Sequence, residues 1–175
     1  MIHMPFLPMK PVTGLSVAST EWKTLVADEH DWIAQPWLDG GRACLYRGAG
    51  NLQVLNEFGS PVQVLLDARA WYRVAKDTLL DGWILRGHFF PWEVLADGGG
   101  NHLHATAADR IARAQDLCLE IKKGWPFQME AILKSEWAFM CTGVLLKQKD
   151  GPYVVRKHYR GRCDDWPLHE FLRGE

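Results

Sequence analysis

Four basic side chains near the C-terminus form the densest set that could bind a ligand. Residues 153–162 read Tyr-Val-Val-Arg-Lys-His-Tyr-Arg-Gly-Arg, with the positive charges at Arg156, Lys157, Arg160 and Arg162. Positive charge beside aromatic rings can neutralise phosphates and stack on bases. The same composition is typical of a solvated strand face, and the sequence leaves both interpretations open.

Two histidines are the next candidates, because His102 and His104 are spaced to face one side of a strand and ligate a metal. They follow three glycines and precede a predicted helix. No neighbouring cysteine or carboxylate completes the three or four donors that a metal site needs. We therefore expect a loop pair and no metal.

Motifs of common enzyme classes are missing from the sequence. It has no Gly-x-Ser-x-Gly, and the three glycines at residues 98–100 lack the Lys-Ser/Thr partner of a phosphate-binding loop. The cysteines at positions 44, 118, 141 and 163 form no Cys-x-x-Cys pair. They are typical of reduced, buried thiols, and cytoplasm is the expected location.

Length and composition limit the fold class. The chain has 175 residues, of which 47% are hydrophobic and 23% charged, as in an ordinary soluble domain. No apolar run approaches the roughly 18 residues of a membrane span, so we expect no membrane partner. The net charge of -1 gives no global positive field, and any contact with nucleic acid must be local.

The elements that position these residues are short strands around a few helices. Residues 1–20 are predicted to form a surface arm before a single domain over residues 21–175. Thr106 and Asp109 resemble a capping box at the start of the clearest helix. We predict strands at residues 32–36, 43–46, 52–55, 62–66, 90–96, 143–147 and 153–156, and a turn that leads into a strand within residues 79–87. Helices are predicted at 68–76, 107–123 and 129–134. This order favours an α+β fold of antiparallel sheets with flanking helices.

Several segments combine Asp-Gly or Gly-apolar-Lys patterns with aromatic residues. Residues 35–42 read Gln-Pro-Trp-Leu-Asp-Gly-Gly-Arg, residues 81–83 Asp-Gly-Trp, residues 92–97 Trp-Glu-Val-Leu-Ala-Asp and residues 142–147 Thr-Gly-Val-Leu-Leu-Lys. In this order they resemble the motifs of the adenylation domain of ATP-dependent DNA ligases, part of the covalent nucleotidyltransferase superfamily. The resemblance extends over residues 32–166 and implies the ligase-type nucleotidyltransferase fold.

The resemblance also marks where the chain departs from the family. Trp37 stands at the position of the nucleophilic lysine. The motif positions at which a functional residue of the family is replaced are Trp37, Glu57, Trp83, Thr142 and Leu168. The retained residues that the resemblance implies as nucleotide contacts are Asp39, Arg42, Trp92, Arg110 and Lys147. The OB-fold domain that follows in the family is not expected here.

These departures imply a domain that has lost its reaction. A tryptophan indole can only donate one hydrogen bond, so Trp37 cannot attack the α-phosphate of ATP as the lysine amine does. We expect a catalytically inactive module that binds nucleotide or nucleic acid, with DNA, RNA or a protein that supplies missing ligase parts as partner. No cofactor is expected; ATP and magnesium enter only if activity is retained.

Two other interpretations remain open at this stage. One keeps nucleotidyl transfer or polynucleotide ligation and assigns the nucleophile to another lysine, such as Lys147 or Lys23. The other is a purely structural subunit that uses some of the nine tryptophans to contact a protein partner, because tryptophan is enriched at interface hot spots.

Overall fold

The computed structural model describes residues 13–16, 20–28, 30–56, 58–121, 140–153 and 158–162. The chain divides into two compact units, which are described separately. The first contains Gly40–Trp125 and Pro152–Val154, and the second contains Lys10–Asp39, Pro126–Gly151 and Val155–Glu175. Among the described residues, no helix is long and apolar enough to cross a membrane.

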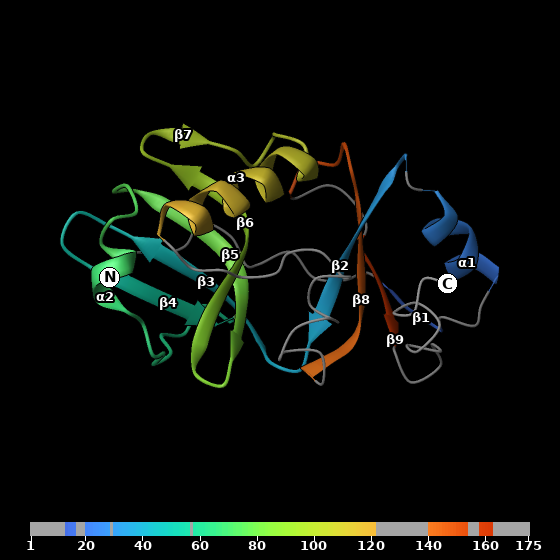
Figure 1. Cartoon of the computed structure of the whole chain (residues 1–175), viewed down its shortest axis with the longest axis horizontal. Coiled ribbons are helices and arrows are strands. Elements are labelled where there is room, and N and C mark those ends of the chain that lie inside the picture. The colour runs from blue at the N-terminus through green and yellow to red at the C-terminus, as the bar shows by residue number, and fades with distance from the viewer. Residues whose placement is uncertain are drawn as a thin grey trace. The chain divides into compact units, whose positions relative to one another are not determined.

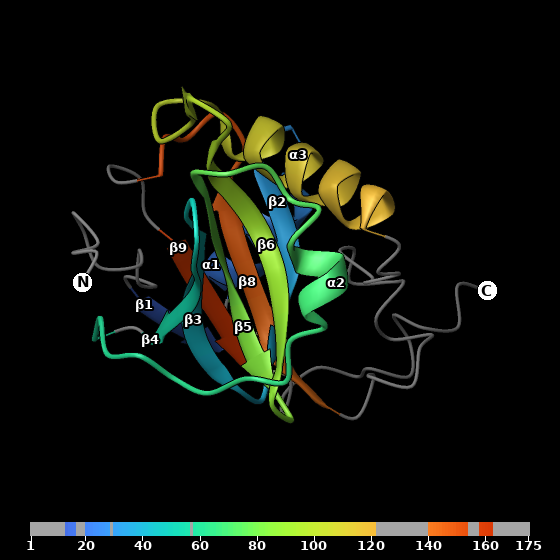
Figure 2. The same ribbon diagram turned by 90° about the vertical axis from the view of Figure 1, so that its left-hand side faces the viewer.

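The first unit is built on an antiparallel sheet of five strands in the order β4-β3-β5-β6-β7. Figure 2 shows β3, β5 and β6 side by side. The strands are β3 (Gly41–Arg47), β4 (Leu52–Asn56), β5 (Thr78–Leu85), β6 (His88–Asp97) and β7 (Gly100–Asn101). The short helix α2 (Ala68–Trp71) precedes β5, and α3 (Ala107–Glu120) packs along β6 (Figure 1).

The second unit is a four-stranded sheet in the order β1-β9-β8-β2. Its elements are β1 (Thr13–Ser16), α1 (Thr20–Ala27), β2 (Trp32–Leu38), β8 (Cys141–Gln148) and β9 (His158–Arg162). Only β1 and β9 pair in parallel; the other pairs are antiparallel. Pro36 lies in β2, which is an edge strand of this sheet. Proline has no backbone N–H to donate, and an edge strand tolerates it because its outer side needs no ladder bond.

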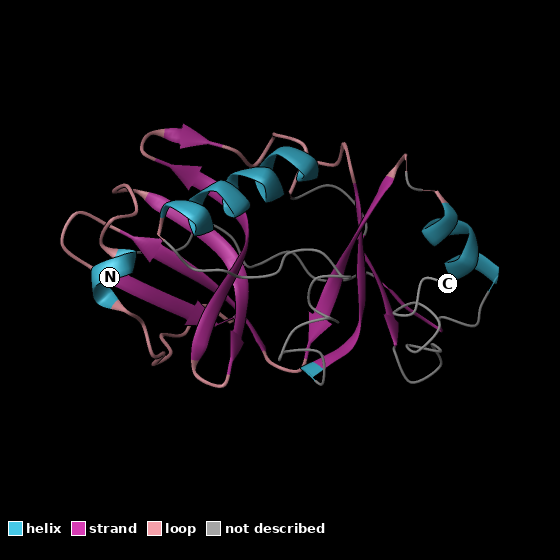
Figure 3. Cartoon of the chain, viewed as in Figure 1, coloured by secondary structure: helices cyan, strands magenta, loops and turns pink. Residues whose placement is uncertain are grey.

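The predicted α+β class is confirmed, since sheets of mainly antiparallel strands and few helices make up both units (Figure 3). The hairpin expected from residues 43–46 and 52–55 is the β3–β4 pair. Thr106 caps α3 as predicted, because its Oγ accepts from the N–H of Asp109 at 3.0 Å. The glycine turn after β6 is also confirmed, with positive φ at Gly98 and Gly99.

Two predicted elements in the first unit are wrong in type or length. Residues 62–66 form no strand, because their N–H groups donate to scattered carbonyls, Val62 to Val54 and Leu65 to Gly87, and build no ladder. The predicted helix 68–76 ends at Trp71. One turn suffices to bury Ala70 and Trp71, and exposed turn residues follow.

Other predictions fall partly or wholly outside the described residues. The helix predicted over 107–123 extends to Glu120 with Ile121 as its cap, and residues 122 and 123 are not described. The helix predicted at 129–134 and most of the strand at 153–156 lie outside the described residues. The boundary between an arm at 1–20 and a domain at 21–175 stays a prediction, although β1 and the first residue of α1 fall within the arm.

Candidate functional site

The centre of the first unit holds a buried ion pair between neighbouring strands. Arg42 on β3 donates from Nε to Oδ1 of Asp81 on β5 at 2.7 Å, and its Nη2 reaches the other carboxylate oxygen. Asp81 is fully buried and Arg42 is 8% exposed. Tyr153 donates its hydroxyl to Oδ2 of Asp81 at 2.7 Å. The carboxylate is therefore bound through both oxygens, one of them shared by two donors.

A second buried ion pair lies next to the first. Asp81 is directly opposite Glu93 in the β5–β6 register, so strand pairing brings the two carboxylates close together. Glu93 accepts from Nε of Arg110 on α3 at 2.6 Å, and Arg110 also donates to the carbonyl of Ala105. The Arg110 guanidinium carbon lies 5.6 Å from the Tyr153 ring centre, so Tyr153 contacts both pairs.

The pKa directions of three buried groups follow from their burial and from the charges beside them. Burial alone lowers the pKa of Arg42, but the Asp81 carboxylate outweighs it and holds that pKa above its usual value. Burial, and then the charge of Asp81, raise the pKa of Tyr153 well above 10.0, so its hydroxyl stays a hydrogen-bond donor. Burial likewise raises the pKa of the Cys44 thiol, which excludes it as an activated nucleophile at neutral pH.

Two predicted motif tryptophans pack beside this cluster. The rings of Trp83 and Trp92 are 5.3 Å apart at 56°, and both side chains are buried. The Arg42 guanidinium carbon is 5.8 Å from the Trp83 ring centre. Gly82, between Asp81 and Trp83, is required because a Cβ there would lie 2.0 Å from the carbonyl oxygen of Phe90. The Asp-Gly-Trp segment thus has a structural reason for each of its residues.

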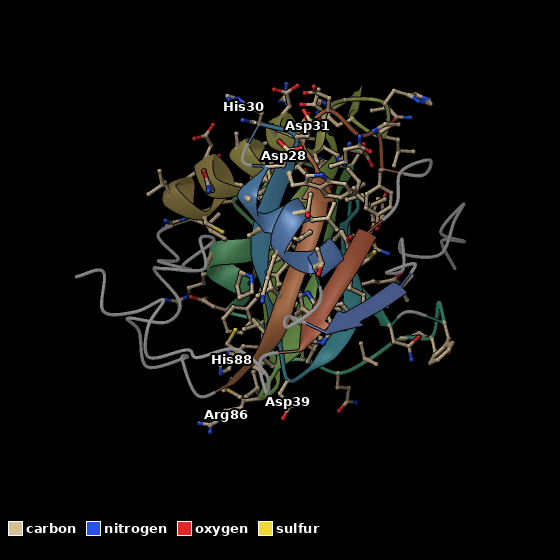
Figure 4. All side chains as sticks on the ribbon, turned by 90° about the vertical axis from the view of Figure 1, so that its right-hand side faces the viewer. Asp28, His30, Asp31, Asp39, Arg86 and His88 are labelled. Atoms are coloured by element: carbon tan, nitrogen blue, oxygen red, sulfur yellow. The ribbon has the colours of Figure 1, made fainter. Side chains whose placement is uncertain are left out.

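The first motif lies on β2 and the turn after it, in the second unit. Trp37 is half-buried, pairs with Gly143 of β8 and directly precedes a shift in strand register. Asp39 is exposed and lies at the end of β2 opposite to Asp28 and Asp31 (Figure 4). Only the backbone N–H of Asp39 has a described bond, to the carbonyl of Met140 at 2.7 Å.

Gln35 is a site residue that the sequence reasoning did not single out. Its side chain is 1% exposed, and within the described part of the chain neither the nitrogen nor the oxygen of its amide has a hydrogen-bond partner. An orphaned buried amide is costly, so a bound polar group or an ordered water is expected there. The sequence signal that could have identified Gln35 is its position at the start of the first motif, two residues before Trp37.

The remaining predicted residues are distributed over both units. Lys147 is fully buried on β8, opposite Ile33 of β2. Thr142 lies in β8, and Arg160 and Arg162 lie in β9, but only their backbones are described. The predicted residues outside the described part are Glu57, Arg156, Lys157 and Leu168.

The structure brings Arg42, Trp92 and Arg110 into one buried cluster in the first unit. Both guanidinium groups are already engaged by carboxylates. The geometry thus assigns the two arginines a structural role, and their predicted contacts with a nucleotide stay predictions.

The two histidines lie in the turn before α3, as the sequence predicts. His102 is hydrogen-bonded through Nε2 to Oδ1 of Asp97 at 2.8 Å. This carboxylate was not identified from the sequence as a partner of the histidine. In the part of the chain that the structure describes, no group of three or more His, Cys, Asp or Glu residues could hold a metal ion. The described cysteines, Cys44, Cys118 and Cys141, are buried, as predicted.

No protein-family model and no curated protein sequence matches the chain. Solved structures do match. Mycobacterial DNA ligase D complexed with ATP and MES superposes with a TM-score of 0.59 and 17% identity over 77% of this chain. The ligase domain of LigD from M. tuberculosis gives a TM-score of 0.57 and 16% identity over 77% of this chain.

The chain has a ligase-type nucleotidyltransferase fold. This confirms the fold that the order of its motifs implies. The chain covers 55% and 54% of the two ligase structures, so it spans about half the length of the proteins it resembles. At these identities the likeness shows the fold alone, and function has to be argued from the residues.

Proposed function

We propose that this chain is a catalytically inactive nucleotide-binding module with the ligase fold. The residue that supports the loss of chemistry is Trp37, which the motif resemblance aligns with the nucleophilic lysine of the family. An indole offers one N–H donor and no amine, so it cannot form the phosphoramide bond of a lysyl-adenylate. The Trp37 side chain is half-buried, and its backbone pairs with Gly143 in the β2–β8 ladder.

The buried cluster of the first unit supports the same proposal. Phosphoryl transfer depends on positive groups that are available to the phosphates. Here Arg42 and Arg110 are each bound to a buried carboxylate, at 2.7 Å and 2.6 Å, so their charges are already compensated. Recruiting either arginine to a phosphate would leave Asp81 or Glu93 as an unpaired buried charge, which is strongly unfavourable.

Gln35 supports retained nucleotide binding. Its buried amide offers one acceptor and two donors without described partners. A glutamine amide matches the adjacent acceptor and donor of an adenine edge, and it is the usual bidentate partner of that base. We therefore place the base of a bound adenine nucleotide at Gln35, without an attack on its phosphates.

Alternative nucleophiles have less support from the geometry. Lys147 is fully buried in the β8 strand and, unlike Gln35, already takes part in an interaction within the fold. Lys23 is exposed on α1, and among the described residues no hydrogen bond or ion pair that would position its amine is shown. We propose nucleic acid as the macromolecular partner, on the basic composition of residues 156–162.

The nucleotide proposal is tested by substituting Gln35 in the full chain. Gln35→Leu removes the orphaned amide. It is expected to weaken ATP binding about tenfold in equilibrium dialysis, because the hydrogen bonds between this amide and the base are lost. The same variant should be as stable as the parent or more stable without ATP, because no buried polar group is left unsatisfied.

The matched control is Gln53→Leu, which removes a half-buried glutamine on β4 of the first unit. ATP binding to this variant should equal that of the parent chain. Nucleotide binding at Gln35 is refuted if both leucine variants bind ATP like the parent, or if the parent does not bind ATP at all.

A further inference from the structure

A pocket of about 600 Å³ lies in the first unit, apart from the buried cluster described above. It is bounded by the second half of α3, the end of β6 with its glycine turn, and the segment that leads into β5. Its volume is in the range of small-molecule sites. All its lining residues belong to the same unit.

Thr78 gives the pocket an unsatisfied polar group. Thr78 lines the pocket and is 1% exposed, and its hydroxyl has no hydrogen-bond partner among the residues that the structure describes. Burying a hydroxyl without a partner is unfavourable for folding. A hydrogen-bonding ligand group in the pocket would remove this penalty.

The charges that line the pocket divide into paired and unpaired groups. Asp97 is compensated, since it accepts from Arg113 at 3.3 Å and is bound to His102 at 2.8 Å. Arg73, Asp116 and Glu120 have no ion-pair partner in the described chain. One unpaired positive charge and two unpaired negative charges therefore remain around the pocket.

The two unpaired carboxylates are placed to bind cations. Asp116 and Glu120 are four residues apart, on one face of α3. They lie in the C-terminal half of the helix, towards the end where the helix dipole adds negative potential. An ammonium or guanidinium group is the natural partner for this pair, whereas Arg73 suits a carboxylate.

We propose that this pocket binds a small ligand with one anionic group and two cationic groups, of the kind found in a basic α-amino acid. Its carboxylate pairs with Arg73, its cations pair with Asp116 and Glu120, and the Thr78 hydroxyl donates to or accepts from its polar atoms. This ligand balances every unpaired charge around the pocket. The site is independent of the nucleotide proposed at Gln35, which lies in the second unit.

The ligand class is tested by calorimetric titration of the full chain with three related probes. L-arginine carries all three charged groups, agmatine lacks the carboxylate, and L-citrulline has a neutral side chain. Saturable binding is expected for L-arginine. Agmatine and L-citrulline should each bind at least about tenfold more weakly, because each lacks one charge-assisted contact. Equal binding of all three, or no saturation by about 10 mM L-arginine, would overturn the proposal.

Variants locate the binding in this pocket. Arg73→Gln and Glu120→Gln, both at exposed residues, should each weaken L-arginine binding about tenfold. Arg69→Gln and Asp109→Asn remove the same charges from exposed residues that do not line the pocket, and should leave binding unchanged. Equal losses in the two sets would show non-specific charge attraction and refute the site.

Thr78→Val separates the hydroxyl from the charges. It keeps the shape of the side chain and removes the unsatisfied group, so the unliganded chain should be at least as stable as the parent while L-arginine binds more weakly. If Thr78→Val and Arg73→Gln both fold and both bind L-arginine as tightly as the parent chain does, the proposal is contradicted.

Discussion

Arg42 and Asp81 join strands β3 and β5 through a two-point contact in which Nε donates to Oδ1 at 2.7 Å and Nη2 approaches Oδ2. The pair is buried, and Tyr153 donates a further hydrogen bond to the same carboxylate. These residues come from the two Asp-Gly motifs and from a segment far away in sequence. The motif arginine and the motif aspartate of this chain thus bind each other.

Removing the charge of Asp81 should destabilise the fold strongly. Asp81→Asn leaves the Arg42 guanidinium buried without a counter-ion, which is expected to lower the free energy of unfolding by about 3–5 kcal/mol in urea titrations. Asp77→Asn is the control, because Asp77 is exposed and its positive φ of 61° is one that asparagine tolerates. Among the bonds described, the Asp77 side chain contacts only the hydroxyl of Tyr46. Similar losses in both variants would refute the importance of the buried pair.

The Glu93–Arg110 pair should behave as a unit. Arg110→Met leaves Glu93 unpaired and should cost about 3–5 kcal/mol, whereas the double variant Glu93→Leu with Arg110→Met should recover most of that loss. Arg113→Met, which breaks the half-exposed pair with Asp97 at 3.3 Å, should cost about 1 kcal/mol or less. The interpretation is wrong if Arg110→Met alone is as mild as Arg113→Met.

Stability should fall at alkaline pH through the buried thiol of Cys118. Burial raises its pKa from 9.0 to about 12, so between these values the folded chain keeps a proton that the unfolded chain releases. The contribution is complete below pH 9 and is lost as the pH rises towards 12. Urea titrations at pH 8 and pH 10.5 should show a smaller loss for Cys118→Ala than for the parent. Equal losses would show that Cys118 does not ionise differently in the two states.

Nucleic-acid binding should depend on the basic segment near the C-terminus. Replacing Arg156, Lys157, Arg160 and Arg162 with glutamine removes positive charge from the segment. DNA or RNA retained by the parent chain at low salt should then be lost, and the salt dependence of binding should become shallower. A parent chain that retains neither nucleic acid would favour a protein as the partner.

Much of the fold could be predicted from the sequence because its local signals agree with its packing. The 43–55 hairpin, the Thr106 cap and the glycine turn after β6 depend on local geometry. Residues 62–66 look like a strand by composition, but only Val62 donates to a carbonyl of β4 and Leu65 donates to Gly87, so no continuous ladder forms. Local sequence could not show this, because strand formation depends on distant partners.

The candidate site was less predictable for the same reason. Arg42 and Arg110 were identified as charged residues, yet their buried partners Asp81 and Glu93 are set by strand register and helix packing. The orphaned amide of Gln35 and the unsatisfied hydroxyl of Thr78 are also properties of the folded chain. Residue type in the sequence identified the candidate charged side chains. Only the contacts in the folded chain show which polar and charged side chains have a partner and which do not.

The central proposal is that this ligase-type fold forms no covalent nucleotide, because the motif resemblance puts Trp37 where the family has its nucleophilic lysine. The most direct test is the intact mass of the purified chain after incubation with ATP and magnesium, and in parallel with GTP. We expect an unchanged mass in both reactions. A mass increase of one nucleoside monophosphate would contradict the claim and assign the nucleophile to another residue, which peptide mapping would then identify.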